Sequence, residues 1–125
     1  MAILDINPNT EGVTLVIPKT HYDSYAFEHS DDFLAEFVTA TKAVVKKLEK
    51  ALDVTRVGMV WEGMGVNHLH AKLYPFHGVG KEFETMEHGT EKVYFENYPG
   101  YLTTQLGEQA EFGKLEELAK KIREA

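Results

Sequence analysis

The stretch "VNHLHAKLYP", residues 66–75, places two histidines and a lysine at alternate positions, which is the period of a β-strand. Successive side chains of a strand point to opposite faces, so this strand has one polar and one largely apolar face. The polar face carries His68, His70 and Lys72, flanked by Val66 and Tyr74. The other face carries Asn67, Leu69, Ala71 and Leu73. We expect the second face to pack on a helix, which leaves the polar row to be explained.

Two explanations of the polar row compete. Polar side chains are common on the solvated face of an antiparallel sheet, and a single histidine needs no other reason. Two histidines and a lysine in succession are different, because like-charged neighbours on one face are unfavourable without an anion between them. The glycine loop "EGMG" before the row and Pro75 after it also favour a site. We therefore interpret the row as functional.

The first half of the chain predicts two strands and a long helix. Two β-rich runs, 1–6 and 13–19, are separated by the turn formers "NPNTEG". Apolar residues then follow the helical period, which predicts an amphipathic helix over 31–52. Ser30 is the expected N-cap, and two aspartates in the first turn suit the positive end of the helix dipole.

The second half predicts strands at 56–63 and 66–74, two extended pieces around a turn at 97–100, and a helix within 111–125. This order predicts an α+β fold, with a mostly antiparallel sheet of about five strands, the long helix packed on it and a C-terminal helix. With 125 residues and 43% hydrophobic content, we expect a single domain over 1–125.

Composition limits the classes of partner. The balance of 13 basic against 20 acidic residues has a formal net charge of −7, which argues against binding of nucleic-acid polymers. A small anion is compatible, because imidazole, lysine and backbone N–H groups can hold a phosphate locally. The absence of cysteine removes disulfides and thiolate zinc sites. The start "MAILDINPNT" lacks a signal-peptide pattern, and no apolar run reaches the roughly 20 residues of a membrane span, so we expect a cytoplasmic protein with no membrane partner.

Two segments resemble the histidine-triad (HIT) superfamily, whose mark is His-x-His-x-His followed by apolar residues on a strand. "LDINPNTEGVTLVIPKTHYDSY", residues 4–25, resembles the family segment with an Asp-Ile turn, a "LVIPK" strand and a following histidine. "GVNHLHAKLYP", residues 65–75, resembles the triad strand. The resemblance covers about residues 2–76, leaves 77–125 as a C-terminal extension, and implies a HIT-like form of the α+β fold.

The resemblance also implies roles for individual residues. His70 matches the central histidine, which is the family's nucleophile and forms a nucleotidyl-imidazole at an α-phosphorus. His68 matches the first histidine, which supports the site, and Lys72 stands at the third position. The expected substrate-binding residues are Asp5, Ile6, His21, Gly65 and Asn67. Asp5 and Ile6 match the turn that contacts the ribose, although Asp5 capping a turn and His21 opening a loop are structural alternatives.

Three departures from the family pattern bear on function. Lys72 replaces the third histidine, and an ammonium can hold a phosphate oxygen but cannot shuttle protons as a histidine does. The loop "EGMGV" lacks the Gln and Ser/Thr that many members place near the phosphates. Relatives generally have a helix and hairpin before the strand that bears Asp5, and these help to enclose the base. Recognition of the nucleotide base is therefore the family property that the resemblance supports least.

Three functional classes follow. The resemblance implies an enzyme that hydrolyses or transfers a nucleotidyl group through His70, with Lys72 stabilising charge on the phosphate. One alternative is a catalytically weak nucleotide-binding protein. Another is a metal site that uses His68 and His70 with His21 or His77. A nucleotide is the expected small-molecule partner and no cofactor is implied. Self-association as a homodimer that joins sheets edge to edge is also expected.

Overall fold

The computed structural model describes residues 1–85, 91–98, 102–103 and 108–125. Contacts divide the chain into two compact units, with the boundary after Glu84. The assignment of the whole chain to one domain stays a prediction.

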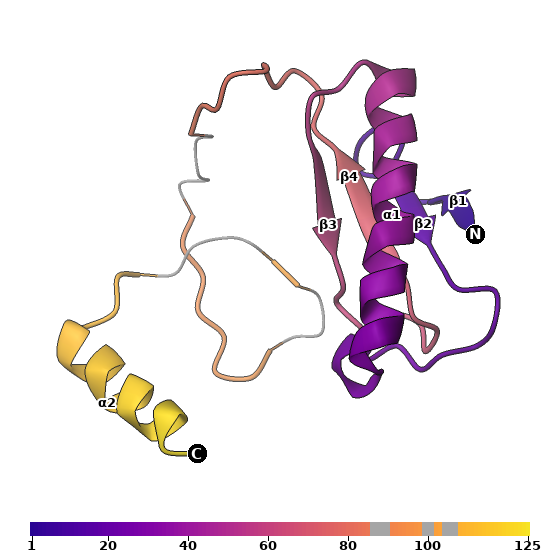
Figure 1. Cartoon of the computed structure of the whole chain (residues 1–125). Coiled ribbons are helices and arrows are strands. Elements are labelled where there is room, and N and C mark those ends of the chain that lie inside the picture. Colours follow the sequence, from indigo (N-terminus) through magenta and orange to yellow (C-terminus); the bar gives the residue numbers. More distant parts are fainter. Residues whose placement is uncertain (86–90, 99–101, 104–107) are drawn as a thin grey trace. The chain divides into compact units, whose positions relative to one another are not determined.

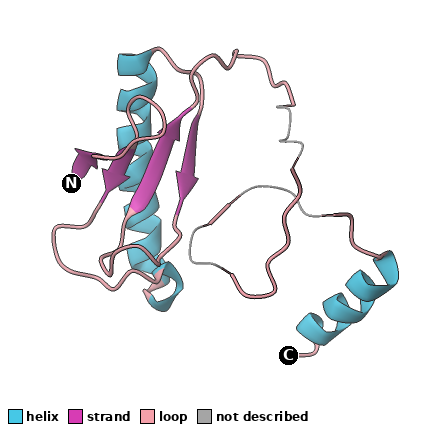
Figure 2. Cartoon of the chain, turned by 180° about the vertical axis from the view of Figure 1, so that it is seen from behind, coloured by secondary structure: helices cyan, strands magenta, loops and turns pink. Residues whose placement is uncertain are grey.

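The first unit is a four-stranded sheet with a long helix on one face (Figure 1). In sheet order the strands are β1 (Ala2–Leu4), β2 (Thr14–Val16), β4 (Ala71–Pro75) and β3 (Val57–Val60). Every neighbouring pair is antiparallel. The helix, α1 (Asp31–Leu52), runs behind the strands in Figure 2, so the side chains on the near face of the sheet point away from it. The expected α+β fold is confirmed.

The strand count is four within the described residues, slightly below the expected number of about five. The additional strand was expected in the segment 91–105. Residues 91–98 and 102–103 contain no strand. The remainder of that segment, including the second half of the turn expected at 97–100, lies outside the described residues.

Strand β4 is shorter than the predicted strand over 66–74, because its first half bonds to a loop instead of to another strand. The His68 N–H donates to the Val66 carbonyl at 2.8 Å, and the Leu69 N–H donates to the Tyr22 carbonyl at 2.8 Å. His68 and His70 therefore precede the strand, and the prediction that they lie within it was wrong. Their placement is set by the loop that contains Tyr22.

The predicted packing face is confirmed. Leu69, Ala71 and Leu73 are each 0% exposed and form one cluster with Phe37 of α1. Tyr22 stacks on Phe33 with ring centroids 4.2 Å apart, and Phe33 stacks on Phe37 at 6.0 Å. The cluster also includes Val16 and Ala26, the latter in the short 3-10 helix η1 (Ala26–Glu28). This core attaches the segment 68–75 and the loop before η1 to the same helix.

The ends of α1 follow the local chemistry that its sequence predicts. The Ser30 Oγ accepts the Phe33 N–H at 3.3 Å, which satisfies one of the unpaired donors of the first turn. The helix ends at Leu52, and the following C-cap residue, Asp53, has a φ of 50°, in the left-handed region. The predicted bounds of 31–52 are confirmed.

The second unit contains α2 (Phe112–Arg123), which confirms the helix expected within 111–125. Its last turn carries the basic residues Lys120, Lys121 and Arg123, which complement the negative end of the helix dipole. No helix among the described residues is long and apolar enough to cross a membrane.

Candidate active site

His70 is held in an orientation that leaves one ring nitrogen available. Its Nδ1 lies 2.8 Å from the backbone oxygen of His68, so we assign the Nδ1 proton as the donor to that carbonyl. The other nitrogen, Nε2, is then the position that can present a lone pair. The side chain is only 14% exposed, so neighbouring groups rather than bulk water decide its chemistry.

Glu62 faces that free nitrogen. Its Oε1 lies 3.7 Å from His70 Nε2, and its side chain is 22% exposed. The two carboxylate oxygens also accept backbone N–H groups, from Met64 at 2.8 Å and from Gly65 at 3.1 Å. Sequence reasoning missed Glu62. It opens the "EGMG" loop, but no spacing rule indicates that this loop turns its carboxylate toward His70.

His21 and His68 form a second contact between the two segments that the resemblance singled out. Their Nδ1 atoms are 3.1 Å apart, so one ring donates and the other accepts. The remaining nitrogen of His68, Nε2, lies 3.1 Å from the Pro18 carbonyl and donates to it. The Nε2 of His21 lies 3.2 Å from Asp23 Oδ1. His68 is thus oriented by the loop that follows β2.

Asn67 joins the same loop to the segment before β4. Its Oδ1 accepts the Ser24 N–H at 2.9 Å, and its Nδ2 donates to Asp23 Oδ1 at 3.2 Å. The Ser24 hydroxyl donates to the Gly63 carbonyl at 2.6 Å. Asp23 and Ser24 were also missed by sequence reasoning, although they lie close to His21 in the chain. In this ligand-free arrangement the Asn67 side chain has a structural role as a clamp between two loops.

Lys72 makes an ion pair with Asp5 at 2.6 Å on the opposite face of the sheet from α1. The lysine side chain is 28% exposed and the aspartate side chain 11% exposed. Asp5 also accepts the Asn7 N–H at 2.8 Å. The anion expected beside the positive row is therefore, in the free chain, a carboxylate of the protein itself.

This pair shifts both groups toward their charged forms. The hydrogen bond from Lys72 lowers the pKa of the Asp5 carboxyl, with help from the Asn7 N–H and against the effect of burial. The hydrogen bond to Asp5 raises the pKa of the Lys72 ammonium, again against burial. The ion pair therefore stays intact over the neutral range.

A pH dependence of stability follows. Stabilisation by Asp5 is present above the unfolded aspartate pKa of roughly 3.9, and it is lost as pH falls through the lower folded pKa. Stabilisation by Lys72 is present below the unfolded lysine pKa of roughly 10.4, and it is lost as pH rises through the higher folded pKa. We expect Lys72→Met to lower the free energy of unfolding by about 1–3 kcal/mol between these limits, and by less beyond them.

Urea unfolding at acid, neutral and alkaline pH, followed by the fluorescence of Trp61, measures this difference. Lys46→Met is the matched control, because Lys46 pairs with Glu49 on the surface of α1 with its side chain 63% exposed. We expect the control to change stability by less than about 1 kcal/mol. An effect of Lys72→Met that is equal at all three pH values would show that the ion pair is not its source.

The expected site residues thus form two groups. The first group lies beside the loop that begins at Glu62 and comprises His21, Asn67, His68 and His70. The second group is the ion pair of Lys72 and Asp5. The Gly65 N–H is directed to Glu62. Ile6 follows Asp5 with its side chain in solvent and is 91% exposed. The structure places these residues but leaves their roles toward a substrate as predictions.

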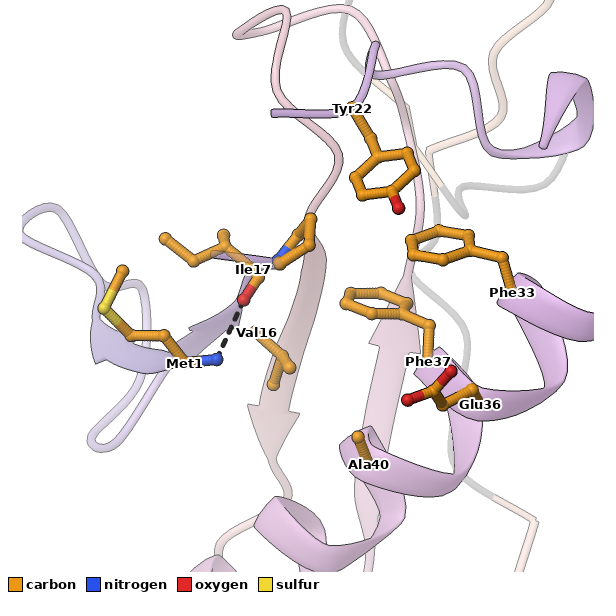
Figure 3. A pocket seen from close by; sticks show the side chains of 9 residues that line it. Met1, Val16, Ile17, Tyr22, Phe33, Glu36, Phe37 and Ala40 are labelled. Atoms are coloured by element: carbon orange, nitrogen blue, oxygen red, sulfur yellow. Dashed lines mark hydrogen bonds between the residues drawn. The ribbon is translucent and has the colours of Figure 1, made fainter. Parts of the chain in front are cut away.

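A cavity of about 270 Å³ lies on the helix side of the sheet, and its lining includes Pro18, whose carbonyl is bonded by His68. Tyr22, Phe33 and Phe37 form its aromatic wall, and the Met1 ammonium donates to the Ile17 carbonyl at 2.9 Å on its opposite side (Figure 3). None of the expected site residues lines it. We therefore treat it as a feature of the core edge.

The metal alternative gains no support from the described part of the chain. No three histidine or carboxylate side chains there converge as a metal ion would require. His77 in particular lies beside the Glu11 carbonyl, with Nε2 2.9 Å from that oxygen.

Comparison with known proteins settles the family. The family model described as the HIT domain matches residues 1–80. The chain belongs to the HIT domain family. A HIT-like protein of Methanocaldococcus jannaschii is 41% identical over 80 residues, which are 60% of this chain and 60% of the relative. A HIT-like protein of Saccharolobus solfataricus is 32% identical over 80 residues, 60% of this chain and 57% of the relative.

A third relative, named Protein hit, from Bacillus subtilis, is 28% identical over 88 residues, 66% of this chain and 60% of the relative. The chain spans about three fifths of the length of the curated relatives it matches. The resemblance read from "LVIPK" and "HLHAK" is confirmed at the level of the HIT family. Within the His-x-His-x-His pattern of that family, this chain has Lys72 at the third position.

Proposed function

We propose that this HIT protein hydrolyses or transfers a nucleotidyl group through a covalent intermediate on His70. One observation carries the proposal: His70 Nδ1 is engaged by the His68 carbonyl at 2.8 Å, which directs the nucleophilic capacity of the ring to Nε2. The largely buried setting of the ring also protects such an intermediate from uncontrolled hydrolysis. The substrate is a nucleotide with a leaving group on its α-phosphorus.

In this mechanism the lone pair of Nε2 attacks the α-phosphorus, and the bond from phosphorus to the leaving group breaks. Lys72, two residues after His70 in the sequence, stabilises the charge that develops on the phosphate oxygens. His68 keeps the backbone carbonyl that orients His70 in place, because its own ring is anchored to Pro18 and His21. Water or another acceptor then releases the nucleotidyl group.

A specific observation also favours the alternative of a catalytically weak nucleotide-binding protein. The ammonium of Lys72 is already paired with Asp5 at 2.6 Å, so a phosphate competes with an internal carboxylate for it. Incubation with a panel of nucleoside phosphate esters and phosphoramidates, followed by mass analysis of the intact protein, separates the two. A nucleotidyl adduct located on His70 supports the enzyme, and binding without an adduct or turnover supports the alternative.

Lys72 is tested by its effect on ligand binding. We expect Lys72→Met to weaken binding of a nucleoside monophosphate by roughly 1.5–3 kcal/mol, the range for a hydrogen bond to a charged group. Titration calorimetry measures the change, with Lys46→Met as the charge-matched control. Unchanged affinity in Lys72→Met would remove the lysine from the phosphate site.

Lys72→His restores the family pattern and sharpens the comparison. Faster nucleotidyl hydrolysis in this variant would mean that the wild type is a weakened enzyme of the HIT type. Slower hydrolysis would mean that lysine suits the chain's own substrate.

We also propose that the protein is a cytoplasmic homodimer. Strand β1 lies at the edge of the sheet with Ala2, Ile3 and Leu4 all exposed, so its outer hydrogen-bonding groups are available to a second sheet. Light scattering at micromolar concentration tests the dimer. A measured mass of 14.2 kDa, that of one chain, would contradict it.

A further inference from the structure

Glu62 places a carboxylate beside the reactive nitrogen of His70. Its Oε1 lies 3.7 Å from His70 Nε2, within ion-pair distance. The loop that it begins holds it there, since both of its oxygens accept backbone N–H groups, from Met64 and Gly65. A carboxylate has about four lone-pair positions, so each oxygen keeps capacity for another proton or hydrogen bond.

We infer that Glu62 is the proton-transfer residue of this site, acting as acid toward the leaving group and as base toward the attacking water. The inference rests on the proposed function and assigns a task that Lys72 is unable to perform. A lysine ammonium has no lone pair, and this one is held as a cation by Asp5. Glu62 thus supplies the proton transfer that the missing third histidine leaves open.

The geometry is compatible with transfer in both directions. The distance of 3.7 Å is longer than a hydrogen bond, but catalytic contacts in ligand-free sites are often long and shorten when the substrate is bound. The Glu62 side chain is 22% exposed, so it can reach a substrate oxygen while remaining beside His70. The Nδ1 atom of His70 stays bonded to the His68 carbonyl throughout.

The proton balance closes over two steps. In this proposal the cycle begins with a proton on Glu62 and a lone pair on His70 Nε2. When substrate is bound, Nε2 forms a bond to the α-phosphorus, and the bond to the leaving oxygen breaks with its electron pair. That oxygen takes the proton from Glu62. In the second step water attacks phosphorus, Glu62 accepts its proton, and the Nε2–phosphorus bond breaks to return the electron pair to the ring.

The experiment compares leaving groups of different acidity. The probes are the p-nitrophenyl and methyl esters of nucleoside 5′-monophosphates with each of the four common bases, used in single-turnover reactions of the full chain. A p-nitrophenolate ion leaves without a proton, whereas methoxide needs one. We expect Glu62→Gln to slow release of methanol by on the order of 100-fold or more, and release of p-nitrophenolate by less than about 10-fold.

A second readout follows from the base role of Glu62. With the p-nitrophenyl ester, the nucleotidyl adduct on His70 should persist longer in Glu62→Gln than in the wild type, as measured by intact mass. Glu62→Asp retains a carboxyl group and should recover part of the methyl ester rate. Glu28→Gln, an exposed glutamate of η1, is the matched control for loss of one negative charge.

The outcomes separate this inference from the function it rests on. Equal slowing of both esters in Glu62→Gln, with no longer-lived adduct, would mean that Glu62 only closes its turn, while the proposed function stands. No adduct and no release with the wild type would overturn the proposed function and this inference together. If circular dichroism shows that Glu62→Gln does not fold, Glu62→Asp tests the inference instead. Relative to the wild type, its rate with the methyl ester must then fall more than its rate with the p-nitrophenyl ester.

Discussion

Substitution of His70 by alanine should reduce turnover of a nucleotidyl substrate by at least roughly 1,000-fold, because removal of a nucleophile eliminates the covalent route altogether. Binding of a nucleoside monophosphate should remain close to the wild-type value, since a nucleophile contributes to the transition state more than to the ground state. Steady-state kinetics and titration calorimetry measure the two quantities separately. The intact-mass adduct should also be absent.

His77→Ala is the control for loss of an imidazole. This histidine is exposed and contacts only the Glu11 carbonyl in the hydrogen bonds described, with Nε2 2.9 Å from that oxygen. We expect its kinetics to match those of the wild type.

If His70→Ala keeps turnover within a factor of a few, or if an adduct still forms, His70 is not the nucleophile. Should neither variant nor the wild type bind or turn over any member of the panel, the row of His68, His70 and Lys72 is a polar surface and the enzymatic proposal fails.

The second large effect concerns stability. We expect Leu73→Ala to lower the free energy of unfolding by roughly 2–5 kcal/mol, because it removes a fully buried side chain and leaves a cavity. Leu73 is 0% exposed in β4, where it lies opposite Thr14 of β2 and Met59 of β3, under α1. The central position of β4 gives the surrounding elements little freedom to close the space.

Urea unfolding followed by the fluorescence of Trp61 reports on this core. The chain has one tryptophan, and its ring centroid lies 5.7 Å from that of Phe37 in the same cluster. Val38→Ala is the control, because Val38 is an apolar residue of α1 that is 43% exposed and lies outside β1. Its effect should be within about 0.5 kcal/mol. Similar effects of the two substitutions would contradict the assignment of Leu73 to the central core.

Local chemistry was sufficient to predict the scaffold of the first unit. The bounds of α1 follow from its apolar period together with the Ser30 N-cap, and both depend only on residues within a few positions of one another. The burial of Leu69, Ala71 and Leu73 likewise follows from a period of two. The alternation of burial persists although residues 68 and 70 lie outside the hydrogen-bonded strand. The Leu69 N–H bonds to the Tyr22 carbonyl, and the Leu69 side chain belongs to the same core cluster as Ala71 and Leu73.

Part of the candidate site was also accessible from sequence. The pattern of His68, His70 and Lys72 and the "LVIPK" segment were enough to indicate the HIT family, which the comparisons confirm. The start of β4 was predicted too early, because alternation of side chains does not show which backbone groups find a partner strand. That information depends on the path of a loop 47 residues away, as the separation of Tyr22 and Leu69 shows.

The sequence by itself determined the elements, the packing face and the family, since each of these depends on short-range periodicity or on a contiguous motif. Only the tertiary structure decided which polar side chains meet: Lys72 with Asp5, Glu62 with His70, and His21 with His68. The partners Lys72 and Asp5 are 67 positions apart, and His21 and His68 are 47 apart. Antiparallel pairing of β4 with β2 and β3 brings the loops that carry His21 and Glu62 to the start of β4. Pairing of β1 with β2 places Asp5 beyond the Leu4–Thr14 pair, toward the other end of the sheet. Local propensities do not determine the register of these strands, because it is set by the collective burial of apolar side chains.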